Sequence, residues 1–232
     1  MTLPPNIRWI KSDLSGAIGK SDTPAIKQAL QEALVQMTYG VDISSLLSEI
    51  IQCSEVPDIT VKKMVYTIMT TMARQDPEIS IMLTNTLFKD CSSDNPIIRG
   101  LALRAICDIE VTTTAEELPK IIANGLMDQN SYVRGIATLS VVYLHRVNPT
   151  ATEELGLLER IQELLIDPDP SIIANAIMTL SQVLGDAFYV NHQLMNRILS
   201  ILDQFSDWKQ VAIISKLNGY QPESSQELSR LL

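Results

Sequence analysis

Residues 89–106 read KDCSSDNPIIRGLALRAI, a stretch that contains the end of one helix, a tight turn and the start of the next helix. Asp94 and Asn95 can cap the second helix by accepting hydrogen bonds from its free N–H groups, and Pro96 suits its first position. Apolar residues then recur at helical spacing as far as Ile106, so one broad face of this helix is expected to be buried. A single helical hairpin cannot bury such a face, which predicts further hairpins stacked against it.

The same kind of helix start recurs along the chain at a spacing of about 35 to 40 residues. The matching positions are Ile26-Lys27, Val61-Lys62, Ile98-Arg99, Val133-Arg134, Ile173-Ala174 and Trp208-Lys209. The first helices of the pairs are expected at residues 43–52, from Pro77 to about residue 88, through residues 121–126 after a capping box at 114–117, at 153–165 and at 193–202. Two helices per unit at this period indicate an α-solenoid of the HEAT or armadillo kind. We therefore predict an all-α fold of about six helical hairpins, in which residues 1–232 form a single solenoid.

The composition limits the classes of partner and compartment. The net charge is −9 and the isoelectric point is near 4.7, so the chain should repel a phosphate backbone, and nucleic acid is not expected as a partner. The three cysteines are odd in number and lie in or beside apolar helical pattern, which favours a reducing cytosol and a role as small hydrophobic residues. No apolar run approaches the length of a membrane span, and we predict a soluble, intracellular protein.

Patterns that would indicate chemistry are weak. Residues 16–21 (GAIGKS) resemble part of a phosphate-binding loop, but Leu14 stands where that loop needs its first glycine, so we interpret the stretch as a helix end with Gly19 just after it. The histidines, His145 and His192, fall in different repeats, and no cysteine–histidine pair has zinc spacing. We predict that the protein is not an enzyme and has no cofactor and no metal site.

Several separated blocks carry a family resemblance. They are NTLFKDCSSDNPIIRGLALRAI at 85–106, DQNSYVRGIATLSVVYLH at 128–145, LLIDPDPSIIANAIMTLSQVL at 164–184 and DWKQVAIISKLNGYQPESSQEL at 207–228. In this order they resemble the N-terminal trunk of the beta-type large subunits (beta-adaptins) of clathrin-associated adaptor complexes. Through NGLMDQNSYVRG and NRILSILDQFSDW the chain is most similar to the beta subunit of the fourth adaptor complex. The resemblance extends from about Ile26 onward, whereas residues 1–22 match poorly.

The resemblance implies a function. Its members are non-enzymatic scaffold subunits of heterotetrameric vesicle-coat complexes, which act in intracellular protein transport and cargo sorting at the trans-Golgi network or endosomes. It implies a second large chain, a medium chain and a small chain as partners, with an Arf-type small GTPase as a transient one. The expected location is cytoplasmic, with peripheral attachment to membranes. The repeat period alone leaves open a HEAT scaffold outside trafficking, such as a nuclear transport receptor or a phosphatase scaffold.

One candidate partner site lies on the helix that begins at Pro77. Its predicted core stripe consists of Ile79, Met82, Leu83, Thr86 and Leu87. Ile81 and Phe88 lie off that stripe, with Thr84 between them, and should be partly exposed. The resemblance implies that the positions of Ile81 and Thr84 contact the switch region of the GTPase through apolar side chains, a pattern from which Thr84 departs. Ordinary packing between repeats is the alternative.

The basic residues allow a structural and a functional interpretation. A ladder of them lies beside the repeat turns, at Lys27, Lys62, Lys63, Arg99, Arg134 and Lys209. We interpret this ladder as structural, with its members bonding to the caps of neighbouring units. Lys11, Lys20 and Lys27, near the N-terminus, are candidate contacts to a membrane surface.

Overall fold

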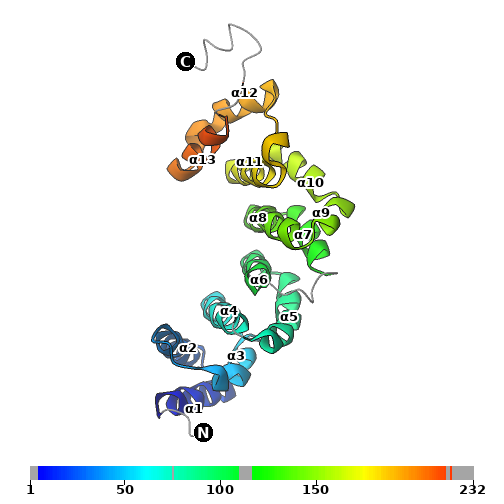
Figure 1. The fold of residues 1–232 in the computed structure, drawn as a ribbon. Coiled ribbons are helices and arrows are strands. Elements are labelled where there is room, and N and C mark those ends of the chain that lie inside the picture. Colours follow the sequence, from blue (N-terminus) through cyan, green and yellow to red (C-terminus); the bar gives the residue numbers. More distant parts are fainter. Residues whose placement is uncertain (1–4, 75, 110–116, 218–219, 221–232) are drawn as a thin grey trace. The chain divides into compact units, whose positions relative to one another are not determined.

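The computed structural model describes residues 5–74, 76–109, 117–217 and 220, and over these residues all regular elements are helices (Figure 1). The chain divides into two compact units, Met1–Ala115 and Glu116–Leu232. Each unit is a run of helical hairpins that pack on their neighbours in chain order. None of the helices in the described ranges is long and apolar enough to cross a membrane.

The first unit contains three hairpins. They are α1 (Pro5–Gly19) with α2 (Thr23–Thr38), then η1 (Ser44–Leu46) and α3 (Leu47–Cys53) with α4 (Ile59–Ala73), then α5 (Pro77–Cys91) with α6 (Pro96–Ile109). The second helices form an inner row, because α2 packs on α4 and α4 packs on α6. The core of the unit lies between the first and second helices of the hairpins. It is built from fully buried aliphatic side chains such as Leu30, Ile68 and Leu87.

The second unit repeats the plan. Its hairpins are α7 (Leu118–Leu126) with α8 (Ser131–Val147), then α9 (Pro149–Glu154), α10 (Leu157–Glu163) and η3 (Leu164–Ile166) with α11 (Pro170–Leu184), and, after η4 (Gly185–Ala187), α12 (His192–Ile201) and η5 (Leu202–Gln204) with α13 (Asp207–Leu217). Helix α8 packs on α11, and α11 packs on α13. The prediction of an all-α solenoid built from six HEAT- or armadillo-type hairpins is thereby confirmed for the described residues.

Side-chain caps fix where the second helices begin. The carboxylate or amide oxygens of Asp22, Asp58, Asn95, Asn130 and Asp169 accept hydrogen bonds from backbone N–H groups in the first turns of α2, α4, α6, α8 and α11. The prediction for the opening stretch is confirmed at Asn95, which accepts from the Ile97 N–H at 2.9 Å, and at Pro96, which begins α6. The predicted repeat starts Val61, Ile98 and Val133 each lie three residues after the cap of their helix. The predicted starts Ile26 and Ile173, in α2 and α11, lie four residues after the cap and are thus displaced by one residue. The cap therefore defines the repeat more reliably than the apolar-basic pair.

Two loops differ from expectation. A single helix was predicted over residues 153–165, but Gly156 adopts a φ of +58° and separates α9 from α10. At the end of α1, the residue with positive φ is Ser21 (+53°) and not Gly19, which is the last helical residue. The interpretation of this stretch as a helix end followed by a turn still holds. Most of the capping box predicted at residues 114–117 lies outside the described residues.

Three members of the basic ladder join neighbouring hairpins, and one of them, Lys27, bonds to a cap as predicted. Lys27 Nζ lies 2.8 Å from an oxygen of Asp58, the cap of α4. Arg134 forms two hydrogen bonds with Asp167, at 2.8 and 2.9 Å, and this contact raises the pKa of the guanidinium. Lys62 and the Tyr66 hydroxyl both contact Asp90 in a buried cluster, where burial, and next the bond to Asp90, raise the pKa of Tyr66.

The cysteines are free thiols. Cys53 is fully buried, and burial, assisted by the nearby charge of Glu49, raises the pKa of its thiol to about 11. A thiol of this kind stays protonated at neutral pH, which agrees with the prediction that the cysteines act as small hydrophobic residues.

Candidate functional site

Helix α5 presents an exposed apolar patch, which we define as Ile81 and Met82. Their side chains are 55% and 57% exposed. The predicted exposure of Ile81 is therefore confirmed, and Phe88, two turns further along the helix, is half-buried. An exposed pair of large apolar side chains on a helix is a surface on which a partner can bury apolar area.

The buried face of α5 is rotated from the predicted one. It includes Ser80, Leu83, Thr84 and Leu87, as well as Asp90, whereas Met82 is exposed, so the prediction that Met82 belongs to the core was wrong. The Ser80 hydroxyl donates to the Ala73 carbonyl at 2.9 Å, and the Thr84 hydroxyl donates to the Ser80 carbonyl at 2.8 Å. Because both hydroxyls are satisfied, these polar side chains can be buried at little cost. A search for apolar residues at helical spacing does not detect such positions.

This rotation separates the residues of the predicted GTPase contact. Ile81 is exposed and Phe88 is half-buried, but Thr84 is only 8% exposed and does not lie on the surface with Ile81. Met82, which the sequence analysis assigned to the core, is the exposed neighbour of Ile81. GTPase binding through Ile81 and Phe88 stays a prediction.

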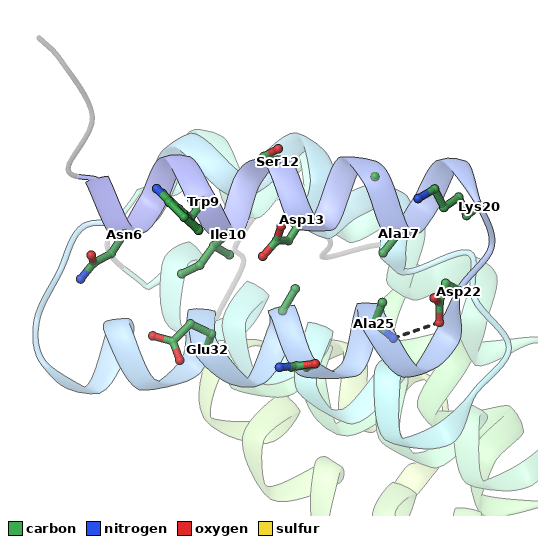
Figure 2. A pocket seen from close by; sticks show the side chains of 13 residues that line it. Asn6, Trp9, Ile10, Ser12, Asp13, Ala17, Lys20, Asp22, Ala25 and Glu32 are labelled. Atoms are coloured by element: carbon green, nitrogen blue, oxygen red, sulfur yellow. Dashed lines mark hydrogen bonds between the residues drawn. The ribbon is translucent and has the colours of Figure 1, made fainter.

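The candidate membrane contacts have different surroundings. The Lys11 ammonium donates to the Ser45 carbonyl at 2.9 Å and lies 3.5 Å from a carboxylate oxygen of Glu49. Lys27 is occupied by Asp58 in the contact described above. Lys20 is exposed at the end of α1 and lies at one end of a groove (Figure 2).

That groove runs between α1 and α2 and has a volume of about 630 Å³. Figure 2 shows Trp9 and Ile10 of α1 at the same end of the groove as Glu32 of α2, with Ala17 and Ala25 facing each other further along. Trp9 is 74% exposed, which is unusual for so large an apolar side chain. The sequence analysis missed the groove. Its only local signal is a tryptophan beside small residues at helical spacing.

The carboxylates of the groove are suited to binding rather than to catalysis. Asp22 is occupied as the cap of α2, where it accepts from the Ala25 N–H at 3.1 Å (Figure 2). Glu32 accepts a hydrogen bond from the Gln36 amide at 2.8 Å, and Asp13 lies on α1 between Ile10 and Ala17, one turn from Trp9. The lining residues include no histidine or cysteine that could serve as base or nucleophile. The groove therefore offers an acidic surface beside an exposed indole ring.

Comparison with known proteins gives the family. The profile of the adaptin N-terminal region matches residues 8–232. Mouse AP-4 complex subunit beta-1 is 31% identical over 228 residues, which cover 97% of this chain and 31% of the mouse protein. The AP-4 complex subunit beta of Dictyostelium discoideum is 33% identical over 218 residues, 94% of this chain and 26% of that protein. Human AP-1 complex subunit beta-1 is 32% identical over 206 residues, 87% of this chain and 22% of that protein.

Among solved structures, a chain of a homology model of the full-length AP-3 complex in an intermediate open conformation has the same fold. Its TM-score is 0.67 at 23% sequence identity, and the match covers 89% of this chain and 34% of that chain. The chain thus spans about a third or less of the length of the relatives it matches. The family resemblance found in the separated sequence blocks is confirmed over nearly the whole chain. This chain belongs to the adaptin family and corresponds to the N-terminal region of its beta-type large subunits.

Proposed function

We propose that this chain is the N-terminal trunk portion of a large beta subunit in a heterotetrameric vesicle adaptor complex. The observation that carries the proposal is the match of residues 8–232 to the adaptin N-terminal region, together with the similarity to beta subunits of the AP-4 and AP-1 complexes. In this function the protein performs no bond chemistry. It acts as a scaffold in intracellular protein transport and cargo sorting, on the cytoplasmic side of trans-Golgi or endosomal membranes.

The packing supports a scaffold. Neighbouring hairpins are joined by charged contacts that fix their relative rotation, such as Arg134 with Asp167 and Lys27 with Asp58. A row of hairpins held in this way offers a long surface on which several partners can bind side by side. The proposed constitutive partners are the second large chain, the medium chain and the small chain of the complex.

Co-purification tests the assignment. The tagged chain would be expressed together with the other three adaptor chains of its own organism and purified by the tag. We expect the medium chain and the second large chain to elute with it in near-equal amounts. A core variant, Ile106→Asp, serves as the control, because a charge at this buried position should unfold the third hairpin and reduce co-elution. Co-elution of a phosphatase or of a nuclear transport GTPase in place of adaptor chains would favour the alternative scaffold.

For the transient partner, we propose that an Arf-type GTPase binds the apolar patch of α5. Ile81 and Met82 supply the exposed surface, and Phe88 lies two turns further along the same helix. Burying such a patch excludes water from both partners, and a few central apolar residues commonly dominate the affinity of an interface.

An Ile81→Asp variant tests this site. We expect its affinity for the GTP-loaded GTPase to fall by roughly thirtyfold, as for a central interface residue. Ile214→Asp is the matched control, because Ile214 is 52% exposed on α13 and its replacement should leave binding unchanged. Circular dichroism must show that both variants keep their helices. Wild-type affinity in a folded Ile81→Asp variant would remove the patch from the proposal.

Peripheral attachment to membranes completes the proposal. We assign it to the basic residues near the N-terminus, where Lys20 is exposed and Lys11 and Lys27 have partners within the chain. Flotation with vesicles that contain phosphatidylserine should decrease in a Lys20→Glu variant, and decrease further at raised salt. Equal flotation of both proteins would exclude Lys20.

A further inference from the structure

The second helices of the hairpins share a contact face that can be located by counting from their caps. The third, seventh and tenth residues after the cap are Val61, Val65 and Ile68 in α4; Ile98, Ala102 and Ala105 in α6; Val133, Ala137 and Ser140 in α8; and Ile172, Ala176 and Thr179 in α11. All twelve side chains are buried, with exposed fractions of at most 6%. The repeat therefore places an apolar or small residue at each of these three positions.

In α11 this face packs on the preceding hairpin. The Thr179 hydroxyl donates to the Thr138 carbonyl of α8 at 3.1 Å. Ile172 approaches α8 so closely that a Cβ atom on Gly135 would lie 3.2 Å from its Cδ1 atom. This face is thus where the second helix of one hairpin packs on the second helix of the preceding hairpin. We call it the receiving face.

In α2 the same three positions are Ala25, Ala29 and Glu32, and all three line the groove of the first hairpin (Figure 2). Glu32 is exposed and Ala25 is half-buried, in contrast to their equivalents. The opposite wall is supplied by α1, where a Cβ atom added to Gly16 would meet no atom within 4 Å. The groove therefore contains the receiving face of α2, and no helix in the part of the chain that the structure describes packs into it.

The charges of this face differ from those of its equivalents. Glu32 stands where α4 has Ile68 and α11 has Thr179, and Asp13 adds a second carboxylate on the α1 wall of the groove, one turn from Trp9. Within the described residues neither carboxylate forms an ion pair. A purely apolar helix placed here would bury both carboxylates unpaired, which is costly. A lysine or arginine would pair with them, and its cation could also lie over the face of Trp9.

We propose that the groove between α1 and α2 binds one amphipathic helix of a partner chain. The apolar ridge of that helix lies over Ala25 and Ala29, and lysine or arginine side chains reach Trp9, Asp13 and Glu32. The interface goes beyond the scaffold function proposed above and does not depend on it, because the groove lies within one hairpin and is formed by α1 and α2 alone. Its failure would leave co-purification with adaptor chains unchanged.

Trp9 supplies the readout. The chain has two tryptophans, so a Trp208→Phe background leaves Trp9 as the only indole that reports. The probe is a synthetic helical peptide of about 18 residues, with a leucine ridge and arginines at one end. Its counterpart has glutamates in place of the arginines. We expect the arginine peptide to shift the emission of Trp9 to shorter wavelength and to bind roughly tenfold more tightly than the glutamate peptide.

Charge reversal makes the test specific. The double variant Asp13→Lys/Glu32→Lys should reverse the preference, so that the glutamate peptide binds more tightly. The matched control is Glu159→Lys/Glu163→Lys, which makes the same charge change at carboxylates of α10, far along the chain from the groove, and should preserve the wild-type preference. Circular dichroism establishes that each variant is folded.

Each other outcome would overturn the proposal. Equal affinity for the two peptides, or no saturable change in Trp9 emission, would mean that the groove does not select a cationic helix. An emission shift that depends on protein concentration alone would assign the face to a second copy of the chain. A shift that requires vesicles of phosphatidylserine would assign it to a lipid surface.

Discussion

Helices α2 and α11 present equivalent faces, formed by Ala25, Ala29 and Glu32 in α2 and by Ile172, Ala176 and Thr179 in α11. The face of α11 is covered by α8, the second helix of the preceding hairpin, whereas the face of α2 lines the groove. The backbone of the two faces follows from the same repeat. Their side chains differ in size or charge at the first and third positions, because a covered face can use large apolar residues, whereas a face in water needs polar ones. The repeat therefore determines where a partner helix lies, and the side chains determine whether that partner is permanent.

Loss of the buried ion pair between α8 and the turn before α11 should reduce the stability most. Arg134→Ala would leave Asp167, whose side chain is only 4% exposed, without its guanidinium partner. We expect a loss of about 4 kcal/mol in the free energy of unfolding, as is usual when one partner of a buried ion pair is removed. Lys27→Ala breaks the more exposed contact with Asp58 and should cost far less, because solvent screens that pair. Urea denaturation measures both. Equal losses would show that the two junctions do not differ in burial.

An apolar truncation tests the covered face directly. Ile172→Ala should lower the free energy of unfolding by about 3 kcal/mol, because it leaves a cavity between α8 and α11. The reverse change at the equivalent position, Ala25→Ile, adds a side chain to the open groove and should change the stability by less than about 0.5 kcal/mol. Denaturant midpoints of the two variants give the comparison. A small effect of Ile172→Ala would contradict the tight packing at this junction.

Adding volume should destabilise the contact between α8 and α11 but not the groove between α1 and α2. Gly135→Val places branched methyl groups where even a Cβ atom would lie 3.2 Å from Ile172 and 3.5 Å from Asn175. We expect destabilisation by about 2 kcal/mol, since one of the two helices must shift. Thermal unfolding followed by circular dichroism would detect it. The variant Gly135→Val/Ile172→Ala should recover part of the loss, whereas simple additivity of the two changes would show that they do not share a contact.

The smallest effect has the opposite sign. Gly16 lies inside α1 beside the open groove, and a Cβ atom added to it would have no other atom within 4 Å. Gly16→Ala should therefore raise the free energy of unfolding by about 0.5 kcal/mol, because alanine loses less backbone entropy in a helix. A decrease in the denaturant midpoint would mean that this wall of the groove is filled.

The hairpin array could be predicted from the sequence because its signals are local. A cap such as Asn95, a proline in the first turn and apolar residues at helical spacing recur along the chain. The interruption at Gly156 could not be predicted, since nothing in the residues around it forbids a continuous helix. The rotation of α5 was missed because it depends on hydroxyl groups that find acceptors, at Ser80 and Thr84.

The candidate sites were less accessible to prediction. Exposure of Ile81 followed from its position off the apolar stripe, but the burial of Thr84 depends on how α5 rests on α4 and α6. The groove could not be predicted, because a groove is a space between two helices and leaves no pattern in either one. It becomes recognisable only when the covered faces of later repeats are compared with it, position by position.

Asp167 has a consequence for how the second unit unfolds. One of its oxygens accepts from both the Arg134 guanidinium of α8 and the Asp169 N–H beside the start of α11, at 2.9 and 2.8 Å. If the hairpin that contains α8 opens, this carboxylate loses its cation, and a charge in the turn before α11 is left unpaired. We therefore expect the hairpins that contain α8 and α11 to unfold together. The Arg134–Asp167 contact would thus couple the unfolding of two neighbouring hairpins.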